Sequence, residues 1–279
     1  MNQNSFYGVC KCCGAEIKDE NQKINLVKCN SCDLVFCRKI YTEKDFERVY
    51  NELYNATNPK YSKHSVEEFN NLKKQIVNIG YNRKILLSKI IKKHKQKILE
   101  IGSGIGLVGV YLKSFKNIIY EGIEIDKATH EKALELEVNS INGDFSKMNE
   151  NPEMVDIIML WEVLEHIQDL KLFFELAKNK LAPKGKLVFS VPNYNKRLNY
   201  NIIERDDKIY QSGPPVHLNF FEENSIKKVL DFNGFKTNEI KIKKIPYLDL
   251  RNKKFFNFLF KALIGKYHGS TIYVIAELK

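Results

Sequence analysis

The stretch from 97 to 106, which reads KILEIGSGIG, constrains the fold of this chain more than any other part of its sequence. Apolar residues precede Gly102, Gly104 and Gly106, and apolar residues at helical spacing follow from Leu107. This pattern indicates a buried parallel strand, a tight turn and the start of a helix. Glycine suits such a turn because its backbone adopts open conformations and it has no Cβ to keep a ligand away. We therefore expect a ligand to bind beside these glycines.

Strands and helices alternate after the glycine turn. With 97–101 as the first strand, the further expected strands are 118–125, 138–144, 155–161, 186–191, 235–245 and 271–278, and the expected helices are 127–137, 170–181 and 222–233. Alternation of this kind predicts an α/β fold built on a doubly wound, mostly parallel sheet of seven strands. The last two strands break the earlier rhythm, which favours antiparallel pairing at that end of the sheet.

The chain is long enough for a second, smaller unit. Its 279 residues exceed the usual size of one domain, and its hydrophobic content of 43% is ample for a core. We expect a zinc-ribbon-like module at 1–40, a helical linker or cap at 41–95 and the α/β domain at 96–279. Within that domain, 194–234 is expected to form the substrate side, and 246–270 is expected to be an apolar and basic helical insert.

Cysteines are confined to the N-terminal part of the chain. All six fall between residues 10 and 37, and four of them form two C-x-x-C pairs with fifteen residues between the pairs. Two such pairs can bring four thiolates to one tetrahedral zinc ion, and a closed site of that kind has a structural or substrate-positioning role. The expected ligands are Cys10, Cys13, Cys29 and Cys32. Cys12 is a competing ligand, Cys37 is expected to be a packed free thiol, and a redox C-x-x-C pair is the alternative.

The segment from 41 to 95 is polar and has a helical pattern. Thr42 and Asp45 are spaced as a capping box for a helix whose apolar residues recur from 46 to 54, and Pro59 ends that pattern. A second helical pattern extends from 66 to 95. We expect these helices to connect the two units and to cover one side of the ligand pocket.

Charge and hydropathy limit the partners and the location of the protein. The net charge of +11 is compatible with an acidic partner, but the lysines are spread along the chain and form no dense basic block with interleaved aromatics, which disfavours nucleic acid. The sequence contains no run of about 18 apolar residues, so we expect no transmembrane helix. The first residues lack the basic and apolar regions of a signal peptide. We therefore expect a cytoplasmic protein with reduced cysteines.

Polar and aromatic residues stand at the ends of the expected strands, where ligands bind in a doubly wound sheet. Glu124 ends the second strand, where a carboxylate can accept hydrogen bonds from both hydroxyls of a ribose. Asp144 ends the third strand and can accept a hydrogen bond from an adenine amine, with Phe145 available to stack. Trp161 ends the fourth strand. Together these residues predict an adenosine pocket, either for a dinucleotide or for S-adenosylmethionine.

Five segments in this order resemble the motifs of class I S-adenosylmethionine-dependent methyltransferases. They are ILEIGSGIG at 98–106, GIEID at 122–126, NGDF at 142–145, DIIMLWEVLEH at 156–166 and LAPKGKL at 181–187. The resemblance implies an enzyme of this class with a Rossmann-like sheet. The dinucleotide alternative has its own pattern, G-x-G-x-x-G from Gly104 to Gly109, but it explains neither Glu100 nor the four later segments.

The cofactor residues that the resemblance implies lie on these segments. They are Glu100, Gly102, Ser103, Gly104, Gly106, Glu124, Ile125, Asp144, Phe145 and Trp161. By the same resemblance, Glu124 holds the ribose, Asp144 meets the adenine, and Glu100 contacts the methionine moiety directly or through water. Trp161 is either packed in the core or part of the pocket wall.

The cysteine pairs ahead of this domain resemble those of bacterial methyltransferases of sugar and cell-surface polysaccharide pathways, which include sugar-nucleotide C-methyltransferases. The C-methylating enzymes carry a further C-terminal domain that is not recognisable in this sequence. We therefore expect methyl transfer to a hydroxyl oxygen of a sugar, a sugar nucleotide or a surface-glycan precursor. C-methylation of a sugar nucleotide, methylation of rRNA or tRNA, and a non-catalytic cofactor-binding subunit are the alternatives. For RNA, the fourth strand ends in LWEV and not in the N/D-P-P-Y/F motif used on base amines.

Methylation of a hydroxyl needs a group that removes a proton, and histidine is suited to this near neutral pH. His217, in the substrate-side region, is the expected base, with Tyr210 as the second candidate. The alternative is that His217 only holds the surrounding loop by hydrogen bonds. His166 is expected to cap a helix start together with Glu162 and Glu165. These three residues also resemble the divalent-metal cluster of the ubiquinone-pathway O-methyltransferases, although a cluster without metal is the favoured interpretation.

Residues 251–265 form an apolar helical pattern with a basic start. Such a segment can pack on the core, form the face of a homodimer or rest on a membrane surface near a lipid-linked glycan. Packing on the core or in a dimer is the favoured interpretation. On the membrane interpretation, the protein is peripheral at the inner face of the membrane.

Overall fold

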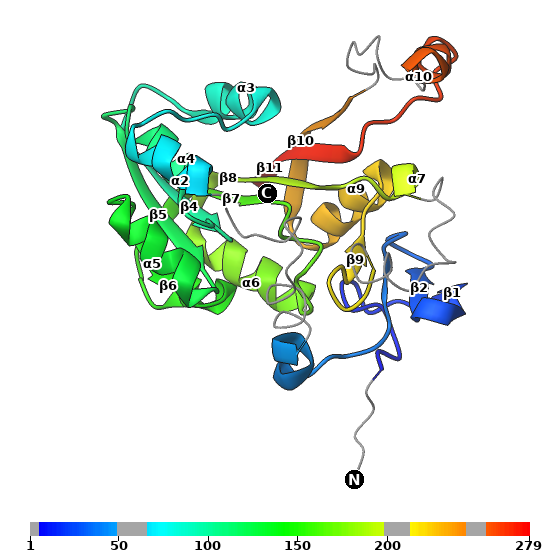
Figure 1. Cartoon of the computed structure of the whole chain (residues 1–279). Helices are drawn as coiled ribbons and strands as arrows, with labels where there is room; N and C mark the ends of the chain where they lie inside the picture. The colour runs from blue at the N-terminus through cyan, green and yellow to red at the C-terminus, as the bar shows by residue number, and fades with distance from the viewer. Residues whose placement is uncertain (1–5, 49–65, 198–212, 244–254) are drawn as a thin grey trace.

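The computed structural model describes residues 6–48, 66–197, 213–243 and 255–279, which form two β-sheets and the helices around them (Figure 1). The strands of the larger sheet are β4 (Gln96–Ile101), β5 (Ile118–Glu124), β6 (Ser140–Asn142), β7 (Val155–Trp161), β8 (Leu181–Pro192), β10 (Phe235–Ile242) and β11 (Thr271–Leu278). The strands of the smaller sheet are β1 (Ile17–Asn21), β2 (Leu26–Cys29), β3 (Val35–Cys37) and β9 (Asn219–Phe220).

The larger sheet has the strand order β10-β11-β8-β7-β4-β5-β6. Five neighbouring strands pair in parallel, namely β8, β7, β4, β5 and β6. Strand β11 is antiparallel to both β8 and β10. This confirms the expected α/β fold with a doubly wound, mostly parallel sheet of seven strands and antiparallel pairing of the last two. The chain goes from β4 to β5 on one side and later to β7 on the other, so the strand order reverses beside β4. Ligands bind at such a point, outside the carboxyl ends of the strands.

Helices cover both faces of the larger sheet (Figure 1). The helices are α2 (Val66–Lys73), α3 (Tyr81–Ile90), α4 (Leu107–Leu112), α5 (Lys127–Glu135), α6 (Leu170–Lys180), α7 (Tyr194–Arg197), α9 (Glu223–Phe232) and α10 (Phe255–Leu263), with short 3-10 turns η1 (Gln22–Ile24) and η3 (Phe145–Asn149). On one face, Ile98 and Met159 of the sheet pack with α3 and α4. On the other face, Leu99 and Leu160 pack with α6 and α9. Burial on both faces explains why the central strands read as continuous apolar runs.

The helical linker differs from the sequence-based expectation. Residues 43–48 are helical and carry the expected cap, since the N–H of Asp45 donates to Thr42 Oγ1 at 3.3 Å and the N–H of Thr42 donates to the Asp45 carboxylate at 2.8 Å. The rest of that pattern lies outside the described residues. The expectation of one helix from 66 to 95 is wrong, because α2 and α3 are separated where Gln75 and Gly80 have φ of 58° and 80°. A residue in this left-handed region ends a helix.

The smaller sheet joins the N-terminal module to residues 219–220, which belong to the region expected to form the substrate side. Its first three strands come from the module, and its fourth, β9, comes from residues near the expected base. Strand β9 pairs with β3 in antiparallel register, Val35 with Phe220 and Phe36 with Asn219. An apolar cluster that includes Leu26 and Leu218 covers this junction. The two units therefore pack as neighbours through a shared sheet.

Helix α10 stands beyond the ends of β10 and β11, apart from the helices that cover the sheet (Figure 1). Of its residues, only Phe255 is buried. The helical insert expected at 246–270 is thus helical at 255–263, and residues 246–254 lie outside the described part of the chain. Among the helices of the described residues, none has both the length and the apolar character needed to cross a bilayer.

Candidate active site

The turn after β4 is packed so closely that two of its three glycines have no room for a side chain. Gly102, Gly104 and Gly106 have φ of 69°, 57° and 83°, which L-residues rarely adopt. A Cβ on Gly102 would lie 2.6 Å from Val163 Cγ2, and one on Gly106 would lie 2.9 Å from the methyl carbons of Val138. Apart from its chain neighbours, no described atom lies within 4 Å of the Cβ position of Gly104. The turn is therefore open at Gly104, as the close approach of a ligand requires.

Glu124, at the end of β5, holds this turn in place. Its side chain is buried, and its carboxylate oxygens accept hydrogen bonds from the backbone N–H groups of Gly104, at 2.8 Å, and Asp126, at 2.9 Å. Each carboxylate oxygen has a further lone pair. Glu124 can therefore accept hydrogen bonds from ligand hydroxyls without releasing the turn.

Glu100 is buried in β4, directly before the turn, and accepts a hydrogen bond from the Tyr120 hydroxyl. Burial raises the pKa of Glu100 to about 8, although the hydrogen bond from Tyr120 opposes this rise. Burial, together with the nearby Glu100 carboxylate, raises the pKa of Tyr120 well above its usual value. Tyr120 therefore stays a hydrogen-bond donor, and Glu100 changes its charge close to neutral pH.

Three further residues expected to bind the cofactor follow β5 and β6. Asp144 is exposed, and its carboxylate accepts hydrogen bonds from the backbone and the hydroxyl of Ser146. Phe145 is half-buried, with its ring edge-on to that of Phe173 at 5.7 Å between centroids. Ile125 is exposed. An exposed carboxylate and two apolar side chains are thus available to a ligand at this end of the sheet.

Trp161, at the end of β7, lies in the core between the sheet and α3. Its ring is buried, and the Arg83 guanidinium lies 5.2 Å from the ring centroid. The indole Nε1 is buried and has no hydrogen-bond partner among the described residues. Buried donors are nearly always paired in proteins. The indole N–H of Trp161 could therefore donate a hydrogen bond to an acceptor atom of a ligand bound at the end of β7.

Glu165, His166 and His217 come together after β7. One carboxylate oxygen or ring nitrogen from each lies within 4.8 Å of the others, and the two imidazole rings are 4.8 Å apart at an angle of 74°. His166 Nδ1 lies 2.6 Å from the carbonyl oxygen of Val216, which can only accept, so Nδ1 carries a proton. His166 Nε2 lies 3.8 Å from the Glu165 carboxylate. The second candidate base, Tyr210, lies outside the described residues.

Backbone hydrogen bonds hold the segment of His217 against the loop of Glu165. The carbonyl of Glu165 accepts from the N–H groups of Leu218, at 2.8 Å, and Asn219, at 3.0 Å. The buried amide of Asn219 also donates to two carbonyls of the 164–167 loop at 2.9 and 2.8 Å. Sequence reasoning missed Asn219, whose only signal is its place two residues after His217.

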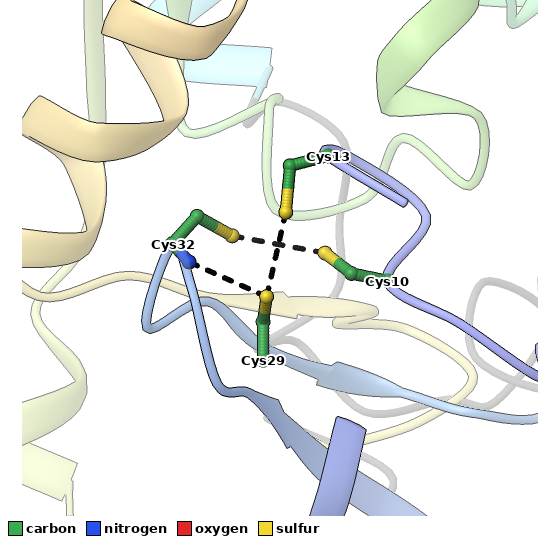
Figure 2. Close-up of side chains that lie close together, drawn as sticks. All are labelled: Cys10, Cys13, Cys29 and Cys32. Carbon is green, nitrogen blue, oxygen red and sulfur yellow. Dashed lines mark hydrogen bonds between the residues drawn. The ribbon is translucent and has the colours of Figure 1, made fainter. Parts of the chain in front are cut away.

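The four cysteines expected to bind zinc converge in the N-terminal module, and Figure 2 shows their sulfur atoms pointing toward one another. The sulfurs of Cys10 and Cys32 are 3.7 Å apart, and those of Cys13 and Cys29 are 3.4 Å apart. The backbone N–H groups of Ser31 and Cys32 donate to the Cys29 sulfur at 3.3 Å. Because the Cys32 thiol and burial raise the pKa of Cys10, the cluster favours a cation that offsets thiolate charge. This arrangement fits a tetrahedral zinc site.

The other two cysteines lie outside this cluster, and all six are free. Cys37 is buried in the apolar cluster beside Phe220, which confirms the expected packed thiol. The sulfur of Cys12 lies 3.2 Å from the amide nitrogen of Asn233, which donates to it. The structure therefore favours the four cysteines of the two C-x-x-C pairs over Cys12 as metal ligands.

Residues 8–240 match a family model described as a methyltransferase domain. The chain belongs to this family. With the sheet topology above, it is a class I S-adenosylmethionine-dependent methyltransferase. A comparison with curated proteins finds no match.

Solved structures of methyltransferases share the fold. A S-adenosylmethionine-dependent methyltransferase from Archaeoglobus fulgidus is similar with a TM-score of 0.52 at 16% identity, over 83% of this chain and 99% of that one. One from Mesorhizobium loti is similar with a TM-score of 0.54 at 13% identity, over 71% of this chain and 98% of that one. Phosphoethanolamine N-methyltransferase 2 of Haemonchus contortus, in complex with S-adenosylmethionine, is similar with a TM-score of 0.54 at 16% identity. The match covers 82% of this chain and 60% of that one. At these identities the likeness shows the fold alone.

Among the described residues, Glu162 is not part of the group with Glu165 and His166 that could hold a metal ion. Glu162 has a φ of 58°, and its carboxylate accepts a hydrogen bond from Ser190 Oγ of β8 at 2.8 Å. His217 completes the cluster in its place. The difference arises because β7 and β8 are neighbours in the sheet, which brings Ser190 to Glu162, whereas His217 arrives from a distant part of the chain.

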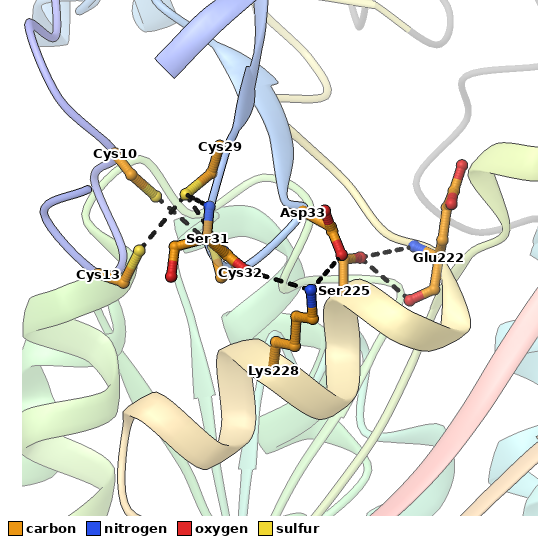
Figure 3. A network of polar contacts seen from close by, with 9 residues as sticks. All are labelled: Cys10, Cys13, Cys29, Ser31, Cys32, Asp33, Glu222, Ser225 and Lys228. Atoms are coloured by element: carbon orange, nitrogen blue, oxygen red, sulfur yellow. Dashed lines mark hydrogen bonds and ion pairs between the residues drawn. The ribbon is translucent and has the colours of Figure 1, made fainter. Parts of the chain in front are cut away.

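The cysteine cluster of the methyltransferase is tied to residues 219–232 by contacts with β9 and α9. Figure 3 shows Lys228 of α9 pointing to the loop that carries Cys32, where its amine donates to the Asp33 carboxylate at 2.6 Å and to the Ser31 carbonyl at 3.2 Å. Strand β9 begins two residues after His217 and pairs with β3 of the module. The N-terminal module is therefore built into the same sheet as the segment that follows His217.

Proposed function

We propose that this methyltransferase transfers a methyl group to a hydroxyl oxygen of a sugar, sugar nucleotide or surface-glycan precursor, with His217 as the general base. The observation that supports this most directly is the contact between the imidazole ring of His217 and that of His166, which lies on the loop that follows β7. The same loop contacts the glycine turn, since the Cβ position of Gly102 lies 2.6 Å from Val163 Cγ2. A proton acceptor thus lies beside the loop that packs on the cofactor turn.

The reaction needs an aligned hydroxyl and removal of its proton. When bound, S-adenosylmethionine supplies the methyl group on a positively charged sulfur and becomes S-adenosylhomocysteine. His217 accepts the hydroxyl proton as the new C–O bond forms and the S–C bond breaks. His166 holds the backbone next to His217 by donating to the Val216 carbonyl. The neighbouring Glu165 carboxylate favours the positive charge that the histidine pair acquires.

We place the cofactor along the glycine turn and the ends of β5 and β6. Glu124 would accept hydrogen bonds from the ribose hydroxyls, since a carboxylate oxygen can accept more than one. Asp144 accepts from the adenine amine, and Phe145 stacks on the adenine ring. Ser103 and the backbone of the turn would hold the methionine moiety, and Glu100 would interact with its ammonium group. The exposed position of Asp144 and the open space at Gly104 support this placement.

Affinity for S-adenosylhomocysteine should increase from about pH 6 to about pH 8. Glu100 holds a proton below its pKa of about 8, and a cationic ammonium group favours the ionised carboxylate, so binding releases a proton. The affinity should therefore rise by up to about ten-fold per pH unit below that pKa. Calorimetry over this pH range measures it. The Glu100→Gln variant should bind with little pH dependence, and a flat wild-type profile would contradict the placement of Glu100.

Release of S-adenosylhomocysteine in a screen of sugar nucleotides and glycans tests the acceptor. A methyl ether in the product supports the proposal, and a new C–C bond would assign C-methylation instead. Methylation of rRNA or tRNA would contradict the sugar acceptor. Filter binding over a salt series separates these cases, because RNA binding falls steeply as salt rises.

A divalent cation is the alternative role for Glu165, His166 and His217. One carboxylate and two imidazoles are ligands that suit first-row divalent metals, and the three groups lie close enough to share one ion. We expect turnover to survive a chelator treatment that leaves the zinc content unchanged. If turnover is lost and returns with Mn²⁺ or Mg²⁺, the cluster is a metal site and His217 is a ligand.

We further propose that Cys10, Cys13, Cys29 and Cys32 hold one zinc ion. Four thiolates close the coordination sphere and leave no open position for chemistry. The ion therefore acts through the structure of the module. A zinc site of reduced cysteines is typical of a reducing, cytoplasmic location, which we also propose.

A further inference from the structure

Helix α10 carries an apolar face that is open to solvent in the described structure. Phe256 and Phe260 are 64% and 61% exposed, and Leu263 is 79% exposed. Spacings of four and three residues place these side chains on the same side of the helix. Phe255 is the buried residue of this helix, and its ring packs against that of Phe256 with 5.5 Å between centroids. An exposed apolar patch of this kind marks an interaction site.

The sequence around this helix is basic. Lys261 and Lys266 are exposed. Three further cations stand between 251 and 254, and no acidic residue occurs from 251 to 270. Lys261 lies about 100° around the helix from Phe260, and Lys266 lies three residues past the end of the helix. An apolar face with lysines on the remaining surface is typical of a helix that lies in the interface of an anionic bilayer. The lysine stems can cover apolar surface while their amines reach headgroup phosphates.

We propose that α10 docks the methyltransferase onto membranes that contain anionic phospholipids. Phe256, Phe260 and Leu263 enter the boundary of the acyl chains, and Lys261 and Lys266 contact lipid phosphates. With nine residues, the helix is too short to cross a bilayer and lies along its surface. Its place beyond the ends of β10 and β11 leaves the sheet outside the bilayer (Figure 1). This docking does not depend on which acceptor the enzyme methylates.

Charge also argues against a second copy of the chain as the occupant of this face. In a symmetric dimer through α10, Lys261 and Lys266 of both copies would approach each other. Like charges brought together in this way repel, and no acidic residue from 251 to 270 is available to offset them. An anionic bilayer removes this repulsion because it supplies the opposite charge.

Co-sedimentation of the full chain with vesicles tests the proposal. We expect binding to vesicles of phosphatidylcholine with phosphatidylglycerol, weaker binding to phosphatidylcholine alone, and partial release by salt. Phe256→Ser combined with Phe260→Ser should weaken binding by about a hundred-fold or more. Lys261→Glu combined with Lys266→Glu should weaken it by about ten-fold or more.

Matched controls separate the face from general effects of the substitutions. Phe232→Ser changes a phenylalanine of α9 that is 55% exposed, and it should bind vesicles like the wild type. All variants should keep their affinity for S-adenosylhomocysteine, which shows that the sheet is folded. Equal binding to both vesicle types, no binding to either, or unchanged binding of the Phe256 and Phe260 variant would overturn the proposal. A wild-type dimer that this variant converts to a monomer would overturn it too.

Discussion

Replacing His217 with alanine should lower turnover by about a hundred- to ten-thousand-fold, the usual contribution of a general base. Affinity for S-adenosylhomocysteine should stay within about two-fold of the wild type, because the groups placed around the cofactor lie on β4 and β5 and in the segments that follow β4 and β6, not on the segment of His217. The rate of S-adenosylhomocysteine release and calorimetry measure the two quantities separately. A variant with normal turnover would remove His217 from the role of base.

The histidine prediction has two controls. His94→Ala changes an exposed histidine outside the cluster and should leave turnover unchanged. His166→Ala removes the hydrogen bond to the Val216 carbonyl, next to His217, and should lower turnover by less than His217→Ala does. Thermal unfolding of all three variants shows whether a loss of activity follows from a loss of folding.

Replacing Cys29 with serine should remove the zinc ion and most of the turnover. The wild type should contain about one zinc ion per chain. Zinc contributes roughly 10–16 kcal/mol to small thiolate modules, so the strands of this module should not persist without it. Strand β3 then no longer supports β9, and the segment that begins with His217 loses its position. Misplacement of a catalytic group by about 1 Å can cost about a hundred-fold in rate, so we expect a loss of about ten- to a hundred-fold.

Three measurements separate this effect from general unfolding. Affinity for S-adenosylhomocysteine should be retained, because the glycine turn and Glu124 lie outside the module. Hydrogen exchange should increase in residues 217–220. Cys37→Ala changes a buried cysteine outside the cluster and should keep its zinc. A Cys29→Ser protein that keeps its zinc, or a zinc-free protein with wild-type turnover, would contradict the link between the module and His217.

Features that depend on short-range patterns could be predicted from the sequence. The turn at Gly102 and Gly106 could be predicted because an apolar segment followed by glycines and then by a helical pattern is typical of a strand, a tight turn and a helix. Glu124 was readable because the carboxyl ends of parallel strands meet at one edge of a sheet. The grouping of the four cysteines could be predicted because each C-x-x-C pair places two sulfurs on one turn.

Features that depend on distant contacts could not be predicted. The break between α2 and α3 follows from a left-handed Gln75, which helical periodicity does not reveal. Tyr120 meets Glu100 only because β4 and β5 pair in register. The hydrogen bond of Glu162 to Ser190 likewise follows from the pairing of β7 with β8.

The amino-acid sequence alone determined the fold class, the glycine turn at the carboxyl edge of the sheet and the two pairs of cysteines, because each is encoded by residues close together in the chain. Only the tertiary structure decided that His217 joins Glu165 and His166, and that the cysteine module supports them through β9. These groups come from three separate segments, and backbone hydrogen bonds such as those from Leu218 and Asn219 to the Glu165 carbonyl form only once the whole chain has packed.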